Sequence, residues 1–210
     1  RHPARCALSR EPSQHQALIM RRLGLLGGTF DPPHAAHVAV ARAALLAGLV
    51  DEVVVVPAGD PWQKSDVTPA VHRLAMTRLA FANEPYCIVD DLETRRSGST
   101  YAIDTVEALA SPHLQLHYII GSDTLALLPT WHRVHDLVRM CTFLVVKRPG
   151  STLTPPVLEG LRVEAVPTET MIDASTDIRF HITAQHTRPD GLADNVWSYI
   201  TEHGLYGVRD

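Results

Sequence analysis

The chain has 210 residues, a formal net charge of −4 and an isoelectric point near 6.3. Apolar residues make up 45% of it and charged residues 20%, which is typical of an ordinary globular domain with a sizeable core. This balance gives no general reason to expect binding to nucleic acid or to a membrane surface, so we expect neither partner. The sequence is silent on oligomeric state, and a homo-oligomer stays open.

The first twenty residues differ in character from the rest of the chain. They contain Pro3, Pro12 and scattered arginines and histidines, and no apolar stretch long enough for a signal-peptide core. We interpret residues 1–20 as a flexible N-terminal extension and residues 21–210 as the folded domain. The three cysteines form no CxxC pair, which suits reduced thiols. These features predict a cytoplasmic protein.

After residue 20, short apolar runs alternate with longer helical patterns. The runs predict strands, and the patterns between them predict helices. Continuous apolar strands alternating with helices predict a Rossmann-like α/β fold, a doubly wound parallel sheet with flanking helices. In such a sheet, ligands bind beyond the carboxyl ends of the strands, near the point where the strand order reverses. The predicted strands span 22–27, 52–57, 87–90, 116–121, 142–147 and, on a weaker pattern, 161–166, and the helices span 35–48, 69–82, 101–110, 132–139, 177–185 and 191–203.

The end of the first predicted strand carries the stretch GGTFDPPHAAH, residues 27–37. Gly27 and Gly28 are placed between the first strand and the first helix, where glycine can adopt positive φ and let the backbone approach a ligand without a Cβ atom in the way. The next helix begins near residue 35, and its free N–H groups favour an anion. His34 and His37 are expected to share a face of its first turn. The pattern therefore favours phosphate binding over a metal pair, because no HExxH or cysteine pair completes a zinc site.

This stretch resembles the G-G-T-F-D-P-h-H-x-G-H signature of the nucleotidyltransferase superfamily, whose two histidines bind a nucleoside triphosphate. It departs from that signature at Ala36, where the family usually has glycine. The resemblance implies that this part of the chain binds ATP. The residues concerned are Gly27, Gly28, Thr29, Phe30, His34 and His37.

Two later segments extend the resemblance. DASTDIR, residues 173–179, resembles the I-S-S-T-x-I-R motif of nicotinate-nucleotide adenylyltransferases, with Asp173 and Ala174 in place of Ile and Ser. Ser175 or Thr176 is expected to cap a helix and Arg179 to hold phosphate, although an everyday cap would explain this segment alone. IIGSDTLALLPTWHR, residues 119–133, is similar to the family's G-x-D-x-L…L-x-x-W-H-R segment. It implies ATP contacts at Gly121 and Asp123, the latter to a ribose hydroxyl, and a flat Trp131 face for an aromatic ring.

A further segment, RRSGSTYAIDT at residues 95–105, looks like the family's R-x-G-x-S-Y-T-x-D-T, with Ala102 for the usual Thr. Backbone groups near Ala102 are expected to meet a pyridine carboxylate. Lys64 and Arg148 are the expected cations for a mononucleotide phosphate, and surface charge is the alternative for both. Gln63 stands where many relatives have His. The implied nicotinate mononucleotide site comprises Gly28, Lys64, Tyr101, Ala102, Thr105, Trp131 and Arg148.

The resemblance implies transfer of the adenylyl group of ATP to nicotinate mononucleotide, giving deamido-NAD and pyrophosphate in NAD biosynthesis. His34, His37 and Arg179 are the expected catalytic residues, and Mg²⁺ accompanies ATP without ligands from protein side chains. Two alternatives stay open. One is a dual-specific enzyme that also accepts nicotinamide mononucleotide. The other is a catalytically weak, nucleotide-binding regulatory module, which Ala36, Ala102 and Gln63 would favour.

Overall fold

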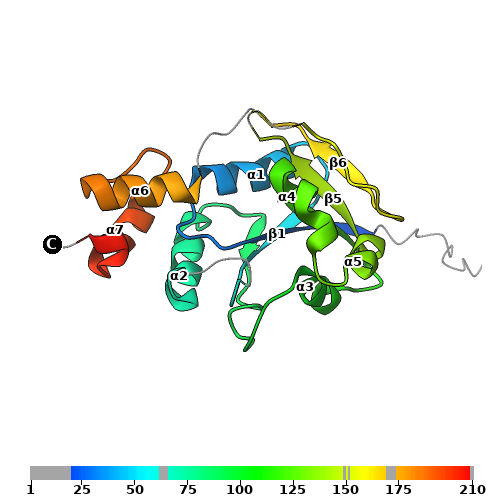
Figure 1. Cartoon of the computed structure of the whole chain (residues 1–210), viewed down its shortest axis with the longest axis horizontal. Coiled ribbons are helices and arrows are strands. Elements are labelled where there is room, and N and C mark those ends of the chain that lie inside the picture. Colours follow the sequence, from blue (N-terminus) through cyan, green and yellow to red (C-terminus); the bar gives the residue numbers. More distant parts are fainter. Residues whose placement is uncertain (1–19, 62–65, 149, 151, 169–173, 209–210) are drawn as a thin grey trace, which may run out of the picture.

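A computed structural model describes residues 20–61, 66–148, 150, 152–168 and 174–208 (Figure 1). The expected N-terminal extension lies, up to residue 19, outside the described residues. Six parallel strands form one sheet in the order β3-β2-β1-β4-β5-β6, which confirms the predicted Rossmann-like fold. The strands are β1 (Arg21–Gly28), β2 (Glu52–Pro57), β3 (Cys87–Val89), β4 (Leu114–Gly121), β5 (Cys141–Val146) and β6 (Val163–Val166).

The predicted helices are present with boundaries shifted by a few residues, and one short helix was not predicted. The extra helix is α4, which follows β4 without a loop and is too short for a helical period to show. No helix in the described part of the chain is long and apolar enough to cross a membrane. The helices are α1 (Ala35–Leu46), α2 (Ala70–Ala80), α3 (Ala102–Leu109), α4 (Ser122–Leu127), α5 (Val134–Met140), α6 (Ser175–Gln185) and α7 (Asp194–Glu202), with short 3-10 turns η1 (Leu128–Thr130) and η2 (Leu205–Gly207).

Successive residues of the central strands enter different cores. Leu25 and Ile120 belong to a cluster with residues of α3, α4 and α5, whereas their neighbours Leu26 and Ile119 join a cluster that includes residues of α1. Both faces of the sheet are therefore buried. This explains why the strands read as continuous apolar runs instead of alternating patterns.

A third apolar cluster joins α2 to the C-terminal helices α6 and α7. Met76 of α2 packs there with Ile178 and Ile182 of α6 and with Val196 and Ile200 of α7, all nearly fully buried. Figure 1 shows these three helices together at one end of the molecule, beside the start of α1. The C-terminal part of the chain is thereby brought next to the loop that follows β1.

The sheet opens where the strand order reverses, between β1 and β4. The recorded pairing of these two strands ends at Leu25 opposite Tyr118, although β1 continues to Gly28 and β4 to Gly121. On their outer sides both strands stay paired to the end, Gly28 with Pro57 and Gly121 with Val146. The two carboxyl ends therefore separate at the place where ligands bind in doubly wound sheets.

Candidate active site

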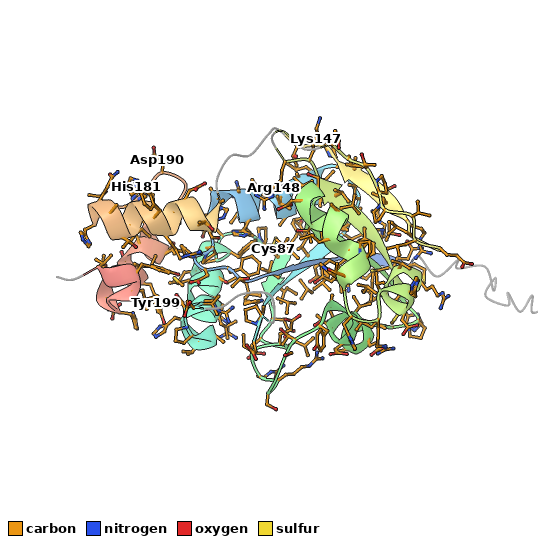
Figure 2. The ribbon with its side chains drawn as sticks, in the orientation of Figure 1. Cys87, Lys147, Arg148, His181, Asp190 and Tyr199 are labelled. Atoms are coloured by element: carbon orange, nitrogen blue, oxygen red, sulfur yellow. The ribbon has the colours of Figure 1, made fainter. Side chains whose placement is uncertain are left out.

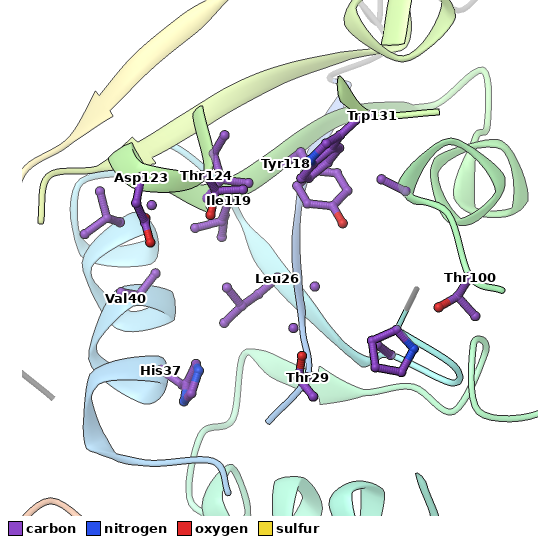
Figure 3. A pocket seen from close by; sticks show the side chains of 18 of the residues that line it. Leu26, Thr29, His37, Val40, Thr100, Tyr118, Ile119, Asp123, Thr124 and Trp131 are labelled. Carbon is purple, nitrogen blue, oxygen red and sulfur yellow. The ribbon is translucent and has the colours of Figure 1, made fainter. Parts of the chain in front are cut away.

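A cavity of about 440 Å³ occupies this opening between β1 and β4. Its floor is formed by Leu26–Thr29 and Tyr118–Gly121, and its walls come from the first turns of α1, α3 and α4 and from the loops nearby. Figure 3 shows His37 and Val40 along α1 on one side, with Tyr118 and Trp131 at another and Thr100 opposite α1. The volume lies in the range of small-molecule and cofactor sites.

The glycines of the opening motif act differently from the sequence prediction. Gly27 and Gly28 are the last residues of β1, and neither has a positive φ; in this loop Phe30 does, at 53°. A Cβ atom on Gly27 would lie 2.6 Å from the Tyr118 hydroxyl, and one on Gly28 would lie 3.1 Å from the Phe30 ring. Neither glycine uses the positive φ that its type allows, and small size is needed because these two aromatic rings pack against them.

The two histidines lie together at the start of α1, as their spacing predicted. His34 is the N-cap residue, and its backbone N–H donates to Nδ1 of His37 at 3.2 Å. The ring centroids are 3.9 Å apart, and Phe30 packs against His37 with centroids 4.8 Å apart. Both imidazoles line the cavity at a helix N-terminus, where the helix dipole favours anions.

His34 is buried in a way that leaves its ring incompletely bonded. The residue is 5% exposed, and the described residues give its Nδ1 atom no hydrogen-bond partner. Burial, assisted by the positive charge of Arg148, lowers the pKa of His34 to about 4. The ring is therefore neutral at pH 7. A buried polar atom without a partner is costly, so an acceptor or donor supplied by a ligand would remove that cost.

The β4 end of the cavity carries a charged pair. Asp123, in the first turn of α4, accepts a hydrogen bond from Nε of Arg148 at 3.2 Å. The Arg148 backbone N–H donates to the buried hydroxyl of Ser122 at 2.9 Å, which fixes the chain after β5. Lys147 also lines the cavity, and both cations follow β5 in Figure 2. Of these two neighbouring cations, only Arg148 was expected from the sequence to bind a phosphate.

The end of the cavity away from the histidines is aromatic. Trp131 stands edge-on to Tyr118, with ring centroids 5.6 Å apart, and Tyr101 packs against His132 at 4.4 Å. Tyr101 is the N-cap of α3 and Ala102 its first residue, so the N-terminus of this helix borders the cavity. An aromatic ring bearing a carboxylate suits such a wall, because the ring can pack while the helix end favours the charge.

A buried carboxylate that sequence reasoning missed also lines this end. Glu93 is 6% exposed, and the Thr105 hydroxyl donates to its Oε1 atom at 2.6 Å. Burial raises the pKa of Glu93, while the hydroxyls of Thr105 and Thr100 act in the opposite direction. Thr105 is fully buried and outside the described lining of the cavity. Its contact with the pocket is therefore indirect, through Glu93.

Several other expected residues also lie outside the described lining of the cavity. Phe30 is buried in the core, and Arg179 donates from Nη1 to the backbone carbonyl of Asp31 at 2.5 Å. The cap expectation was wrong: Ala174 is the N-cap of α6, while Ser175 and Thr176 begin the helix and Ser175 donates to the carbonyl of Pro32 at 3.0 Å. Lys64, Gln63 and Asp173 lie outside the described residues.

Arg73 is a second residue that the sequence did not single out. It is 1% exposed, on α2, and its three guanidinium nitrogens donate to the backbone carbonyls of Thr68, Thr29 and Gly59 at 2.7–2.8 Å. Thr29 follows β1 and Gly59 follows β2, so this side chain joins two of the loops around the cavity. The sequence offers no clear signal for it, because α2 also carries the exposed Arg78, and only the structure distinguishes the two.

The described part of the chain contains no group of three or more His, Cys, Asp and Glu side chains able to hold a metal ion.

Comparison with known proteins defines the class first. Residues 25–186 match the Cytidylyltransferase-like family, a class of nucleotidyltransferases.

Curated relatives narrow the class further. A probable nicotinate-nucleotide adenylyltransferase of Oceanobacillus iheyensis is 37% identical over 90% of this chain and 98% of its own. One of Herpetosiphon aurantiacus is 38% identical over 89% and 99%. The chain belongs to the nicotinate-nucleotide adenylyltransferase family. The fold is similar to that of the Plasmodium falciparum nicotinic acid mononucleotide adenylyltransferase complexed with NaAD, with a TM-score of 0.77 and 20% identity over 90% of this chain and 98% of that one.

Proposed function

We propose that this protein transfers the adenylyl group of ATP to nicotinate mononucleotide, forming deamido-NAD and pyrophosphate, a step of NAD biosynthesis. The observation that carries the proposal is the buried, neutral His34 with an unpartnered Nδ1 atom, beside His37 at the N-terminus of α1. The curated relatives named for this activity span nearly the whole chain, which supports it further.

The reaction is an in-line displacement at phosphorus. An oxygen of the mononucleotide's 5′-phosphate attacks the α-phosphorus of ATP, a new P–O bond forms, and the bond to the bridging α–β oxygen breaks as pyrophosphate leaves. The attacking phosphate is already ionised at neutral pH, so the protein needs no general base. Its task is to place two polyanions and to stabilise the charge that develops on the α-phosphate and bridging oxygens.

The residues around the cavity divide this task by position. His34 and His37 donate to phosphate oxygens, and the N-terminal N–H groups of α1 add to the same field. Arg179 and the first turn of α6, with Ser175 and Thr176, lie across the β1–α1 loop and hold the outer phosphates. The floor below the nucleotide is formed by Gly27, Gly28, Thr29 and Gly121, and Phe30 packs against Gly28. Asp123 accepts a hydrogen bond from a ribose hydroxyl.

The mononucleotide occupies the aromatic end. Trp131 packs on the pyridine ring, the α3 N-terminus at Tyr101 and Ala102 receives the carboxylate, and Arg148 binds the 5′-phosphate. Lys64, which lies outside the described residues, is proposed as a second cation for that phosphate from the sequence alone. Thr105 acts on this site through Glu93. The N-terminus of a helix favours an anion over a neutral amide, and this favours nicotinate mononucleotide over nicotinamide mononucleotide as the substrate.

ATP enters as its Mg²⁺ complex, in which the cation neutralises triphosphate charge. The donors that face the phosphate end are imidazoles and backbone N–H groups, which suit phosphate oxygens more than they suit Mg²⁺. The phosphates themselves would therefore supply its ligands. We place the reaction in the cytoplasm, in a single nucleotidyltransferase domain over residues 21–210.

Pyrophosphate release from MgATP tests the proposal, with nicotinate and nicotinamide mononucleotides offered in parallel. A strong preference for the acid is expected. Comparable use of both would replace it with a dual-specific enzyme. ATP binding without release from either substrate would replace it with the regulatory module, and Ala36→Gly would then be the first variant to assay.

A further inference from the structure

The C-terminal turn of the chain contacts the loop that carries the histidines. The hydroxyl of Tyr206, in η2, donates to Oδ1 of Asp31 at 2.6 Å, across 175 positions of sequence. Asp31 is 3% exposed and lies between β1 and α1, three residues before His34. Neither Asp31 nor Tyr206 belongs to the described lining of the cavity. The contact therefore lies behind the site.

The backbone conformation of this turn directs the Tyr206 hydroxyl toward Asp31. Tyr206 has a φ of 55°, and Gly204 and Gly207 on either side also have positive φ, at 58° and 76°. A tyrosine in this left-handed region is strained unless its surroundings hold it there. Burial and the nearby Asp31 carboxylate raise the pKa of Tyr206, so its hydroxyl remains protonated and able to donate.

Asp31 connects this turn to further supports of the loop. Its Oδ2 atom accepts from the backbone N–H of Thr68 at 3.2 Å, and the carbonyl of Thr68 accepts from Arg73. Its own backbone carbonyl accepts from Arg179. Tyr206 thus contacts the side chain of Asp31, and Arg179 contacts the backbone carbonyl of the same residue.

The first turn of α1 is held from the C-terminal region as well. The Ala35 N–H donates to the carbonyl of Gly191 at 2.8 Å, and the Ser175 hydroxyl donates to the carbonyl of Pro32 at 3.0 Å. Every residue from Asp31 to Ala35 therefore lies within or beside a contact with the last quarter of the chain. The position of His34 depends on that region.

We propose that Tyr206 is a positioning residue for the ATP half of the site. By holding Asp31, it fixes the loop that carries His34 and that Arg179 contacts. The inference depends on the proposed binding of triphosphate by these groups. Tyr206 makes no contact with the cavity's aromatic end in the described structure. Its loss is therefore expected to weaken ATP binding selectively, whereas a purely structural role would lower stability and leave the balance between substrates unchanged.

The test compares Tyr206→Phe with Tyr199→Phe. Tyr199 belongs to the same C-terminal region, but its hydroxyl bonds to Nδ1 of His72 on α2 at 3.0 Å, away from the loop (Figure 2). Because a hydrogen bond to a charged group is lost, we expect Tyr206→Phe to raise the KM for ATP about tenfold and to leave the KM for nicotinate mononucleotide within about twofold. Tyr199→Phe should change neither constant.

Calorimetric titration with MgATP alone separates this inference from the proposed reaction. An about tenfold weaker Kd in Tyr206→Phe supports the positioning role even if the wild-type protein shows no turnover. An unchanged ATP Kd in a folded Tyr206→Phe protein, or equal losses for both substrates, would overturn it. If Tyr206→Phe does not fold, Asp31→Ala removes the contact with Tyr206 together with the one from the Thr68 N–H, and the same two outcomes decide.

Discussion

Strands β1 and β4 lie side by side at the switch point, yet the chain leaves them in different ways. β1 is followed by a loop, residues 29–34, before α1 begins, whereas β4 continues directly into α4 at Ser122. The first end presents His34 and His37, and the second presents Asp123 paired with Arg148. The same topology thus yields one end with two histidines at a helix N-terminus, which we propose binds phosphate, and one charged end, which we propose binds a ribose.

The two ends also differ in what holds them. The β1 loop is held by Arg73, by Arg179 and by Tyr206, all distant in sequence. α4 begins on the strand itself, with Gly121 as its N-cap. A longer loop can present more donors to a ligand, but its shape then depends on remote side chains, because its own backbone leaves many conformations open.

The largest expected effect comes from removing the loop's buried cation. Arg73→Met leaves the carbonyls of Thr29, Gly59 and Thr68 without a donor, and we expect the free energy of unfolding to fall by about 4 kcal/mol. Urea denaturation measures this. Arg78→Met, on the same helix with an exposed ion pair to Asp91, should cost less than about 1 kcal/mol. Equal losses would mean that the three carbonyl bonds matter little.

A second effect concerns pH. The unfolded His34 imidazole binds a proton below its ordinary pKa of 6.5, but the folded one only below about 4. Between these values the unfolded state holds more protons, so stability falls as the pH falls from 6.5 towards 4, by on the order of 3 kcal/mol from this group. His34→Gln should remove this part of the pH dependence. Parallel curves for the two proteins would contradict the burial of a neutral ring.

Turnover should depend strongly on the second histidine. If His37 stabilises the α-phosphate, His37→Ala should lower kcat about 100-fold and leave the KM for nicotinate mononucleotide nearly unchanged. Steady-state pyrophosphate release measures both constants. His135→Ala, an exposed histidine on α5, serves as the control. Near-normal turnover in His37→Ala would remove this residue from the mechanism.

The smallest effect is expected at the β4 end. Asp123→Asn should raise the KM for ATP about tenfold through loss of the proposed ribose contact, and change stability by less than about 1 kcal/mol because the pair with Arg148 is exposed. Asp136→Asn, which alters another exposed pair with Arg133, should leave both substrate constants unchanged. A loss of stability without a change in KM would show that Asp123 supports the fold instead of the nucleotide.

Sequence patterns predicted the sheet and located much of the cavity. Each of the six strands was expected from apolar runs, and both histidines, Asp123, Trp131 and Tyr101 came from motifs placed after strands. The errors have local causes. Gly27 and Gly28 were placed between the first strand and the first helix, but they end the strand, where the rings of Tyr118 and Phe30 require their small size. α4 was missed because its six residues give too short a period.

The amino-acid sequence by itself determined the α/β alternation, the order of the motifs and the histidine pair at the start of α1, because these depend on neighbours within a few residues. Only the tertiary structure decided that β1 and β4 separate beyond Leu25 and Tyr118. It also decided that His34 is buried with an unpartnered nitrogen and that Tyr206 meets Asp31. Such contacts join segments far apart in the chain, and local periodicity carries no information about which distant group will satisfy a buried polar atom.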